Sequence, residues 1–472
     1  MNKSYLFDKY EMIVGLEVHA ELRTESKIFC ACSAAYGGAP NTHVCPICLG
    51  IPGTMPVLNR RAVRFAIAAG LVTDCEIALH THFDRKHYFY PDLPKGYQIT
   101  QYDEPICQGG AITVETEGGA RKIGITRIHL EEDAGKLMHD GALTKIDYNR
   151  CGVPLIEIVS EPDIRSAEEA RAYLRALRER LVFAGISDCR MNEGSMRCDV
   201  NLSVRLRGES TFGVRTEIKN INSIAFAGKA IAYEFLRQAE ILEAGGEITP
   251  ETRRYDEATG TTVLMRKKES AADYRYMREP DLPALMISPA EVEEIRASLP
   301  PMPETYRRRF SEAGISAANT ERLTETPAVA AYFDAVIGRT DAAETAANLL
   351  IGEAFPEGES APEIAPDALS WIAEKMHGRE ITAASARKLV SLCCGGGDPE
   401  AIAKRERMFV LSDEGEIEAL VRAAMQENPD VVRQIREGKE KAKQVLVGAV
   451  MKKSAGRADA QITRRLIDAL CR

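Results

Sequence analysis

The stretch Ile123–Lys136, with the sequence IGITRIHLEEDAGK, combines a strand pattern with a concentration of charge. Its first part predicts a β-strand over residues 123–129. Three consecutive carboxylates, Glu131 to Asp133, and the nearby His129 then stand beside a Gly-Lys turn. Such charge density is costly inside a fold unless a cation meets it. The stretch therefore indicates either a solvated hairpin end or one wall of a metal site.

Other segments predict a sheet around this strand. Short β-like runs punctuated by Gly, Pro, Asn and Asp alternate with three helical patterns, one of which opens with Ser166 and Glu169 at capping-box spacing. Residues 1–292 are therefore predicted to form an α+β domain with a large, mainly antiparallel sheet. The predicted strands are 12–18, 123–129, 155–160, 200–204 and 214–218, and the predicted helices are 59–71, 166–183 and 223–242.

Beyond about residue 288 the strand signals fade and short amphipathic helices take over. The helical patterns are 290–299, 328–337, 342–351, 366–376 and 382–392. We expect an all-helical domain at 293–405 and a small helical tail domain at 406–472. The chain carries a net charge of −9, whereas residues 433–472 hold 11 Lys or Arg against 4 Asp or Glu. This basic tail indicates either nucleic-acid contact or a solvated lysine-rich helix pair.

Composition limits the class of protein. The 472 residues are too many for one ordinary core, and 45% hydrophobic with 28% charged residues is typical of a soluble globular protein. No run of roughly 18 apolar residues exists, and the polar start is not a secretory signal. Twelve scattered cysteines indicate thiols rather than a disulfide framework. We expect a cytoplasmic protein with no membrane partner.

Four cysteines form two close pairs at the spacing of a zinc site. Two pairs on separate turns can close a tetrahedral structural site, since four thiolates leave no open position for catalysis. The alternative is four reduced thiols in a loop. The predicted ligands are Cys30, Cys32, Cys45 and Cys48.

Acidic residues recur on the predicted strands. Glu17 and His19 are two residues apart, so both side chains point to one face of a strand. Glu157 stands alone in an apolar run, and Asp199 and Glu217 repeat the pattern on two further strands. A single Glu/His pair on one strand is more often solvated. Several strands that each carry an acid or a histidine, however, predict a shared acidic cleft.

Cations accompany these acids. Lys86, Arg215 and Lys219, together with several oxygen ligands, suit magnesium and a nucleoside triphosphate. The aromatic loop 83–98 either grips phosphate and stacks a base or packs on the sheet. No P-loop, Rossmann glycine pattern or Gly-x-Ser-x-Gly elbow occurs, so any phosphates would be held by metal and side chains on a sheet.

These segments resemble the B subunit of the aspartyl/glutamyl-tRNA amidotransferases over nearly the whole chain. The resemblance includes Thr252–Asp256 and Asp273–Tyr276, and its motifs are long and specific. The segments that carry it are 14–20, 83–101, 123–136, 149–165, 193–204, 217–224, 251–283 and, in the tail, 438–457.

The resemblance implies a reaction and partners. Such a protein works in a heterotrimer with a glutaminase (the A subunit) and a small third chain (the C subunit). It uses ATP and magnesium to phosphorylate the side-chain carboxylate of Glu mischarged on tRNA(Gln) or Asp on tRNA(Asn). Ammonia arriving through a tunnel then displaces the phosphate.

Residue by residue, the resemblance assigns roles as follows. It implies magnesium ligands at Glu17, His19, Glu132 and Glu157; phosphoryl-transfer residues at Lys86, Lys219, Glu217 and Asp199; an ammonia tunnel mouth at Lys95 with Glu131; and tRNA contacts at Lys439, Lys441, Lys443, Lys452, Lys453 and Arg457. Which of Glu131 and Glu132 faces the metal is open, because strict alternation admits only one of them and a bulge would change which. Family members vary at the four cysteines, which favours a structural role.

Two other classes compete with this interpretation. One is a zinc-stapled tRNA-binding scaffold without catalysis, which the dispersed strand acids disfavour because they would repel phosphate. The other is a metallohydrolase of small substrates, which leaves the helical tail unexplained.

Overall fold

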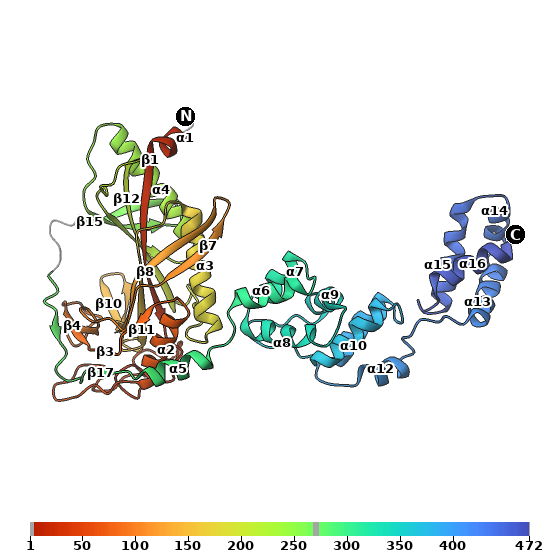
Figure 1. The fold of residues 1–472 in the computed structure, drawn as a ribbon, viewed down its shortest axis with the longest axis horizontal. Helices are drawn as coiled ribbons and strands as arrows, with labels where there is room; N and C mark the ends of the chain where they lie inside the picture. The colour runs from red at the N-terminus through yellow and green to blue at the C-terminus, as the bar shows by residue number, and fades with distance from the viewer. Residues whose placement is uncertain (1–3, 268–272, 472) are drawn as a thin grey trace. The chain divides into compact units, whose positions relative to one another are not determined.

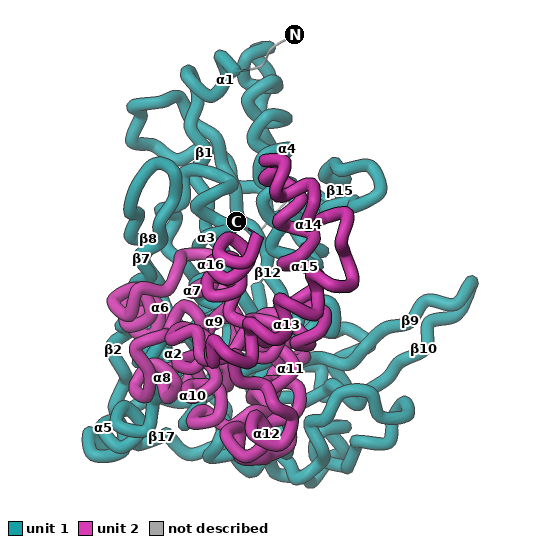
Figure 2. The backbone as a smooth tube through the Cα atoms, turned by 90° about the vertical axis from the view of Figure 1, so that its right-hand side faces the viewer, with its two compact units in different colours: residues 1–302 teal, residues 303–472 magenta. Residues whose placement is uncertain are grey.

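The computed structural model describes residues 4–267 and 273–471. It divides the chain into two compact units, residues 1–302 and 303–472 (Figures 1 and 2). The first unit is built around a large, mostly antiparallel sheet and the second is helical. The predicted α+β fold followed by an all-helical region is confirmed.

A ten-stranded sheet forms the first unit, in the order β15-β14-β13-β12-β1-β11-β8-β6-β2, with β7 paired to β8. Neighbouring strands run antiparallel except for β13 and β14. Every strand predicted from the sequence lies in this sheet. Its strands are β1 (Tyr10–Glu21), β2 (Glu76–Ile77), β6 (Cys107–Gln108), β7 (Ala111–Thr116), β8 (Gly119–Glu132), β11 (Pro154–Ser160), β12 (Met196–Leu206), β13 (Thr216–Ile221), β14 (Glu251–Asp256) and β15 (Thr261–Lys267).

Three small sheets flank the large one. They pair β16 with β4 and β5, β17 with β3, and β9 with β10, and Figure 2 shows the last pair projecting from the first unit as a hairpin. Their strands are β3 (His80–Thr81), β4 (Asp84–His87), β5 (Tyr97–Thr100), β9 (Lys136–Asp140), β10 (Leu143–Asp147), β16 (Met277–Arg278) and β17 (Leu285–Met286).

Three long helices bury one face of the large sheet. They are α2 (Arg60–Leu71), α3 (Ala167–Phe183) and α4 (Ile224–Glu243), and each begins where the sequence predicts. The hydroxyl of Ser166 accepts a hydrogen bond from the Glu169 amide at 3.0 Å. α2 packs on β8, α3 on β7 and α4, and α4 on β12, so sheet and helices share one core.

The strand register aligns charged side chains across the sheet. His19 on β1 pairs with Glu157 on β11, and Glu157 pairs with His129 on β8. On the other side of β1, Glu17 pairs with Asp199 on β12. Directly opposed residues share a face, so the sheet carries a row of titratable groups across its centre.

Helices make up the second unit, and a short helix ends the first. α5 (Pro289–Ser298) packs on α2 and carries the first unit to residue 302, past the predicted limit at 292. Four of the predicted helices are α8, α9, α10 and α11. The helices of the second unit are α6 (Pro303–Glu312), α7 (Ala317–Leu323), α8 (Pro327–Ile337), α9 (Ala343–Glu353), α10 (Pro366–His377), α11 (Ala383–Cys393), α12 (Pro399–Arg405), α13 (Glu414–Glu427), α14 (Pro429–Arg436), α15 (Lys443–Lys453) and α16 (Ala460–Cys471).

The last four helices have a hydrophobic cluster of their own, running from Ile417 to Cys471. The further domain division at residue 405 stays a prediction, with which this separate cluster agrees. A short additional helix, α1 (Ser4–Lys9), precedes β1. Within the described residues, no helix has both the length and the apolar character needed to cross a membrane.

Replacing Ser166 with alanine should weaken the start of α3. The amide of Glu169 loses its acceptor, which costs about 1 kcal/mol for an N-cap serine. We expect roughly fivefold faster hydrogen exchange at the first-turn amides of α3, measured by exchange mass spectrometry. Ser166→Asp keeps an acceptor and should retain slow exchange, and equal exchange rates in all three proteins would contradict the cap assignment.

Candidate functional site

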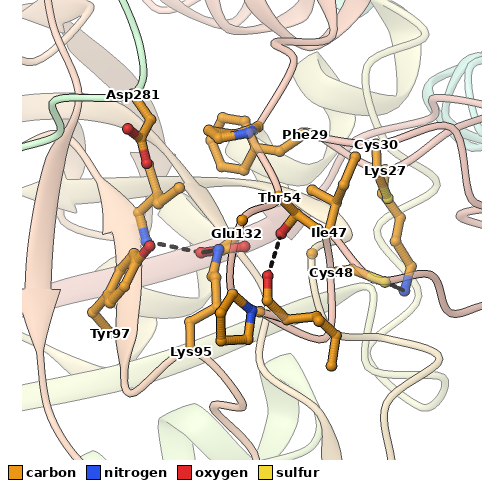
Figure 3. Close-up of a pocket in the computed structure, with 17 residues that line it drawn as sticks. Lys27, Phe29, Cys30, Ile47, Cys48, Thr54, Lys95, Tyr97, Glu132 and Asp281 are labelled. Carbon is orange, nitrogen blue, oxygen red and sulfur yellow. Dashed lines mark hydrogen bonds and ion pairs between the residues drawn. The ribbon is translucent and has the colours of Figure 1, made fainter.

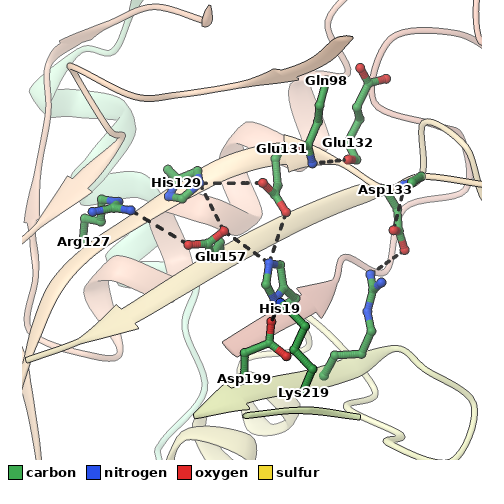
Figure 4. Close-up of polar contacts among 12 residues, drawn as sticks. His19, Gln98, Arg127, His129, Glu131, Glu132, Asp133, Glu157, Asp199 and Lys219 are labelled. Carbon is green, nitrogen blue, oxygen red and sulfur yellow. Dashed lines mark hydrogen bonds and ion pairs between the residues drawn. The ribbon is translucent and has the colours of Figure 1, made fainter. Parts of the chain in front are cut away.

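An imidazole and two carboxylates meet at the centre of the large sheet. The ligand atoms of His19, Glu131 and Glu157 all lie within 4.8 Å of one another (Figure 4). His19 Nε2 lies 3.2 Å from Glu157 Oε2 and 3.5 Å from Glu131 Oε1. His129 Nε2 approaches the same two carboxylates at 3.7 and 3.8 Å. One nitrogen and several oxygens at this spacing can hold a divalent cation.

Mutual charge controls the protonation of this cluster. Burial alone would lower the pKa of His19, but the hydrogen bond with Glu157 and the charges of Glu131 and Glu157 raise it to about 9. Burial would raise the pKa of Glu157, yet the charge of His129 and the contact with His19 hold it well below its ordinary value. These shifts favour an ionised pair between His19 and Glu157.

A second acidic group lies beside the first. Glu17, Asp199 and Glu217 also bring their ligand atoms within 4.8 Å of one another. Lys219 Nζ lies 2.5 Å from Asp199 Oδ2 and 2.9 Å from Glu217 Oε1, and Asn201 donates to Glu17 at 2.8 Å. Burial, followed by the charge of the neighbouring Glu157, raises the pKa of the Glu17 carboxyl. The two groups therefore act on each other electrostatically.

The three residues of the first group and Asp199 of the second border a cavity of about 380 Å³, which we call the acidic cavity; Glu17 and Glu217 are not among its lining residues. Lys86, on β4, reaches it with its ammonium 5.0 Å from the ring centre of Tyr274. The structure thus brings together most of the residues that the sequence predicted for metal binding and phosphoryl transfer. The predicted residues among its lining are His19, Lys86, Glu131, Glu157, Asp199 and Lys219.

The structure places the two adjacent glutamates in different surroundings, while their roles stay predictions. Glu131, not Glu132, lies with His19 and Glu157 (Figure 4), and Glu132 pairs with Lys95. The reason is strand alternation: β8 pairs regularly with β11 from Arg127 to Glu132, so consecutive side chains there point to opposite faces. Because His129 faces the cluster, Glu131, two residues further on, faces it too. In the sequence, the signal for this arrangement was the two-residue spacing of His129 and Glu131, which places both on one face of a strand.

Glu132 and Lys95 lie in a separate cavity of about 200 Å³ (Figure 3). Lys95 Nζ lies 2.5 Å from Glu132 Oε1, which also accepts the Ile99 amide at 2.9 Å. Burial would lower the pKa of Lys95, but the charge of Glu132 more than offsets it and raises the pKa. We call this space the Lys95 cavity. Cysteine side chains form part of its wall.

The four cysteines converge as their spacing predicts. The Sγ atoms of Cys30, Cys32, Cys45 and Cys48 all lie within 4.8 Å of one another, and those of Cys45 and Cys48 are 4.0 Å apart. A tetrahedral zinc with Zn–S bonds of about 2.3 Å requires sulfurs about 3.8 Å apart. The hydrogen bond from Cys30, assisted by the Cys45 amide, lowers the pKa of Cys48 to about 4. The donor set fits a tetrahedral metal.

The predicted tRNA contacts lie in the tail at η1 (Glu440–Ala442) and α15. Lys439, Lys441 and Lys452 are exposed. Lys443 instead pairs with Glu440 and Asp468 at 2.7 and 2.8 Å, and Lys453 pairs with Glu427 at 2.5 Å. Arg457 donates to the Ser454 carbonyl. Three cations of the predicted set, Lys443, Lys453 and Arg457, are therefore already engaged within the tail, and Lys453 is exposed as well.

Sequence reasoning missed a second charge network at the mouth of the acidic cavity. The buried Asp133 accepts from Arg197 at 2.6 Å and lies 3.3 Å from Arg150. Glu21 faces the same carboxylate, and burial together with the charge of Asp133 raises the pKa of Glu21 to about 8. These contacts join residues that are far apart in the chain, so no local sequence pattern predicted them.

Known families match the chain over both units. The model of the GatB/GatE catalytic domain matches residues 12–293, and that of the GatB domain matches residues 331–471. The chain belongs to the GatB family of amidotransferase subunits. The match to the catalytic-domain model spans every residue that borders the acidic cavity.

Curated members of the family are similar over their full length. The B subunit of the aspartyl/glutamyl-tRNA(Asn/Gln) amidotransferase from Caldicellulosiruptor saccharolyticus is 47% identical over 97% of this chain and 98% of its own. Those of Carboxydothermus hydrogenoformans and Geobacillus thermodenitrificans are also 47% identical, with the same coverage. The tRNA-binding domain of glutaminyl-tRNA synthetase from Saccharomyces cerevisiae, 16% identical, aligns over 36% of this chain and 93% of its own at a TM-score of 0.26, too low to bear on the fold.

Glu21 should make the stability of the chain depend on pH. Because its pKa rises from 4.5 to about 8 on folding, the folded state holds a proton that the unfolded state releases between those values. This contribution to stability is complete below pH 4.5 and is lost as pH rises through 8. Glu21→Gln cannot ionise, so its thermal unfolding midpoint should fall less than that of the wild type between about pH 5 and pH 9.

The exposed Glu25 offers a matched control, since Glu25→Gln removes a solvated carboxylate from the same segment. That variant should follow the wild-type pH curve. Identical curves for Glu21→Gln and the wild type would contradict the raised pKa.

Proposed function

We propose that this protein is the subunit that activates and amidates the amino acid on mischarged tRNA. The substrate is Glu-tRNA(Gln) or Asp-tRNA(Asn), ATP and magnesium are required, and ammonia comes from a partner glutaminase, the A subunit, held with the small C subunit. The observation that carries the proposal is the placement of Glu131 and Glu132 on opposite faces of β8. One borders the acidic cavity and the other pairs with Lys95 in a second cavity.

The acidic cavity suits the phosphorylation step. An oxygen of the substrate carboxylate forms a bond to the γ-phosphorus while the bond to the departing ADP oxygen breaks. Two anions must approach each other, which cationic groups make possible. Magnesium held by His19, Glu131 and Glu157 would supply part of that charge. Lys86 and Lys219 supply the rest from the cavity wall.

The Lys95 cavity suits the delivery of ammonia. Ammonia forms the carbon–nitrogen bond at the activated carbonyl and phosphate leaves. Ammonia must arrive unprotonated, and in this cavity of about 200 Å³ the Glu132 carboxylate already holds the Lys95 ammonium in an ion pair. We place the end of the ammonia route at Lys95 and Glu132. The four cysteines would hold a structural zinc beside it, with no open position for chemistry.

Glu131→Gln and Glu132→Gln should separate the two steps in the reconstituted enzyme. Glu131→Gln removes a metal-facing charge, so tRNA-dependent ADP formation should fall about 10²-fold. Glu132→Gln should retain most ADP formation while glutamine-dependent amidation falls at least about tenfold. Both are measured on Glu-tRNA(Gln), with ADP release and Gln-tRNA formation followed in parallel.

Glu115, exposed on β7, offers a control, and Glu115→Gln should leave both steps unchanged. The opposite pattern, with Glu132→Gln abolishing ADP formation and Glu131→Gln sparing it, would contradict the assignment. Wild-type rates in both variants would favour the alternative, a non-catalytic zinc-stapled tRNA-binding scaffold.

The tail should contribute affinity for tRNA through its exposed lysines. Replacing Lys439, Lys441 and Lys452 together with alanine removes three exposed cations. The dissociation constant for tRNA should rise, and the slope of log K against log salt should shrink by about 0.7 to 0.9 for each phosphate that a lysine neutralised. Arg422→Ala, at a site where Glu418 already pairs with the arginine, is the control. An unchanged salt slope would exclude these lysines from tRNA contact.

A further inference from the structure

Lys27 is a fully buried lysine to which the proposed reaction assigns no role. Its side chain is 0% exposed. The ammonium nitrogen lies 3.7 Å from Cys48 Sγ (Figure 3) and 3.3 Å from the Tyr148 carbonyl oxygen. Neither contact is a carboxylate. The site is unusual because a buried lysine normally faces an ionised acid.

A buried ammonium is costly unless an anion offsets its charge. The two carboxylates that line the same cavity already face other cations, since Glu132 lies 2.5 Å from Lys95 and Asp281 lies 3.1 Å from Arg85. A carbonyl dipole at 3.3 Å compensates only part of a full charge. The hydrogen-bonded neighbour that can carry negative charge is the sulfur of Cys48, which belongs to the four-cysteine centre.

The negative charge of a metal-bound four-cysteine centre can offset the positive charge of Lys27. Four thiolates around one Zn²⁺ carry a net charge of about −2, which burial makes unfavourable. One ammonium beside Cys48 reduces this excess without occupying a ligand position. Groups outside the ligand shell that tune a metal site in this way commonly contribute about 10- to 100-fold to metal affinity.

The same contacts reach the Lys95 cavity. Lys27, Cys30 and Cys48 line it together with the loop of residues 50–54. The backbone at Gly50 approaches Lys95 so closely that a Cβ there would lie 2.5 Å from Lys95 Cγ and 3.0 Å from its Cα. This loop has no regular strand or helix, so its position against Lys95 depends on what anchors Cys45 and Cys48.

We propose that Lys27 is a positioning residue of the four-cysteine metal centre. Its buried ammonium offsets the charge of the metal-bound thiolates, and through Cys48 it keeps the loop of residues 45–54 against Lys95. The proposal rests on the zinc and the ammonia route proposed above. Removing the charge at residue 27 loosens the metal, and a loosened metal opens the wall of the cavity that ammonia crosses.

The test replaces Lys27 with methionine, which keeps most of the length of the side chain and removes its charge. In the assembled amidotransferase, competition with a chromogenic chelator should show zinc bound about 10- to 100-fold more weakly. The ratio of glutamine-dependent to ammonium-chloride-dependent amidation should fall as well. Lys122→Met, at an exposed position on β8, is the matched control and should change neither quantity.

A charge-balanced variant keeps the proposal testable where Lys27→Met fails to fold. Cys32→His lowers the negative charge of the ligand set by one, so Lys27→Met should cost less zinc affinity in that background and should recover folding. Wild-type zinc affinity in Lys27→Met, or an equal loss in both backgrounds, overturns the proposal. A wild-type protein that takes up no zinc overturns it as well.

The zinc measurement is independent of tRNA amidation. A complex that binds zinc as expected but forms no Gln-tRNA would contradict the proposed reaction while the chelator experiment still decides the role of Lys27.

Discussion

The alternation of side chains at the end of β8 is the constraint on which the site depends. Glu131 and Glu132 are both nearly fully buried, at 3% and 2% exposure, and they point to opposite faces of one strand. Each therefore needs its own cation. His19 and His129 meet Glu131 on one face, and Lys95 meets Glu132 on the other. Two separate sites on the two faces of one strand follow from this single geometric fact.

Charge compensation explains why the central strands are ordered as they are. The register of β1, β11 and β8 sets His19 opposite Glu157 and Glu157 opposite His129, so that acids alternate with imidazoles across the sheet. A slip of one residue would move every member to the other face and leave buried carboxylates without partners. The ionised network therefore specifies the register in addition to offering a metal site.

Sequence periodicity predicted the elements well because their signals are local. The caps at Asn59, Ser166 and Ser223 and the alternation in β1 each lie within one segment. Long-range pairings had no such signal. Arg197 reaches Asp133, and Lys27 reaches Cys48, only once loops and strands distant in the chain come together. For Glu131 and Glu132, alternation alone left open which of the two faces His19, and in the structure the one on the same face as His129 does.

Two cavities on opposite faces of one strand suit a reaction with two incompatible needs. Phosphoryl transfer between anions needs cations and a polar cavity, whereas ammonia stays nucleophilic only where no acid protonates it. In the proposed reaction, two cavities on opposite faces of one strand would give each step its own electrostatic surroundings. Part of the wall of the Lys95 cavity is the irregular loop of residues 50–54. The proposed metal at the four cysteines, with the Lys27 ammonium offsetting its charge, would give this loop a rigidity that its hydrogen bonds alone do not.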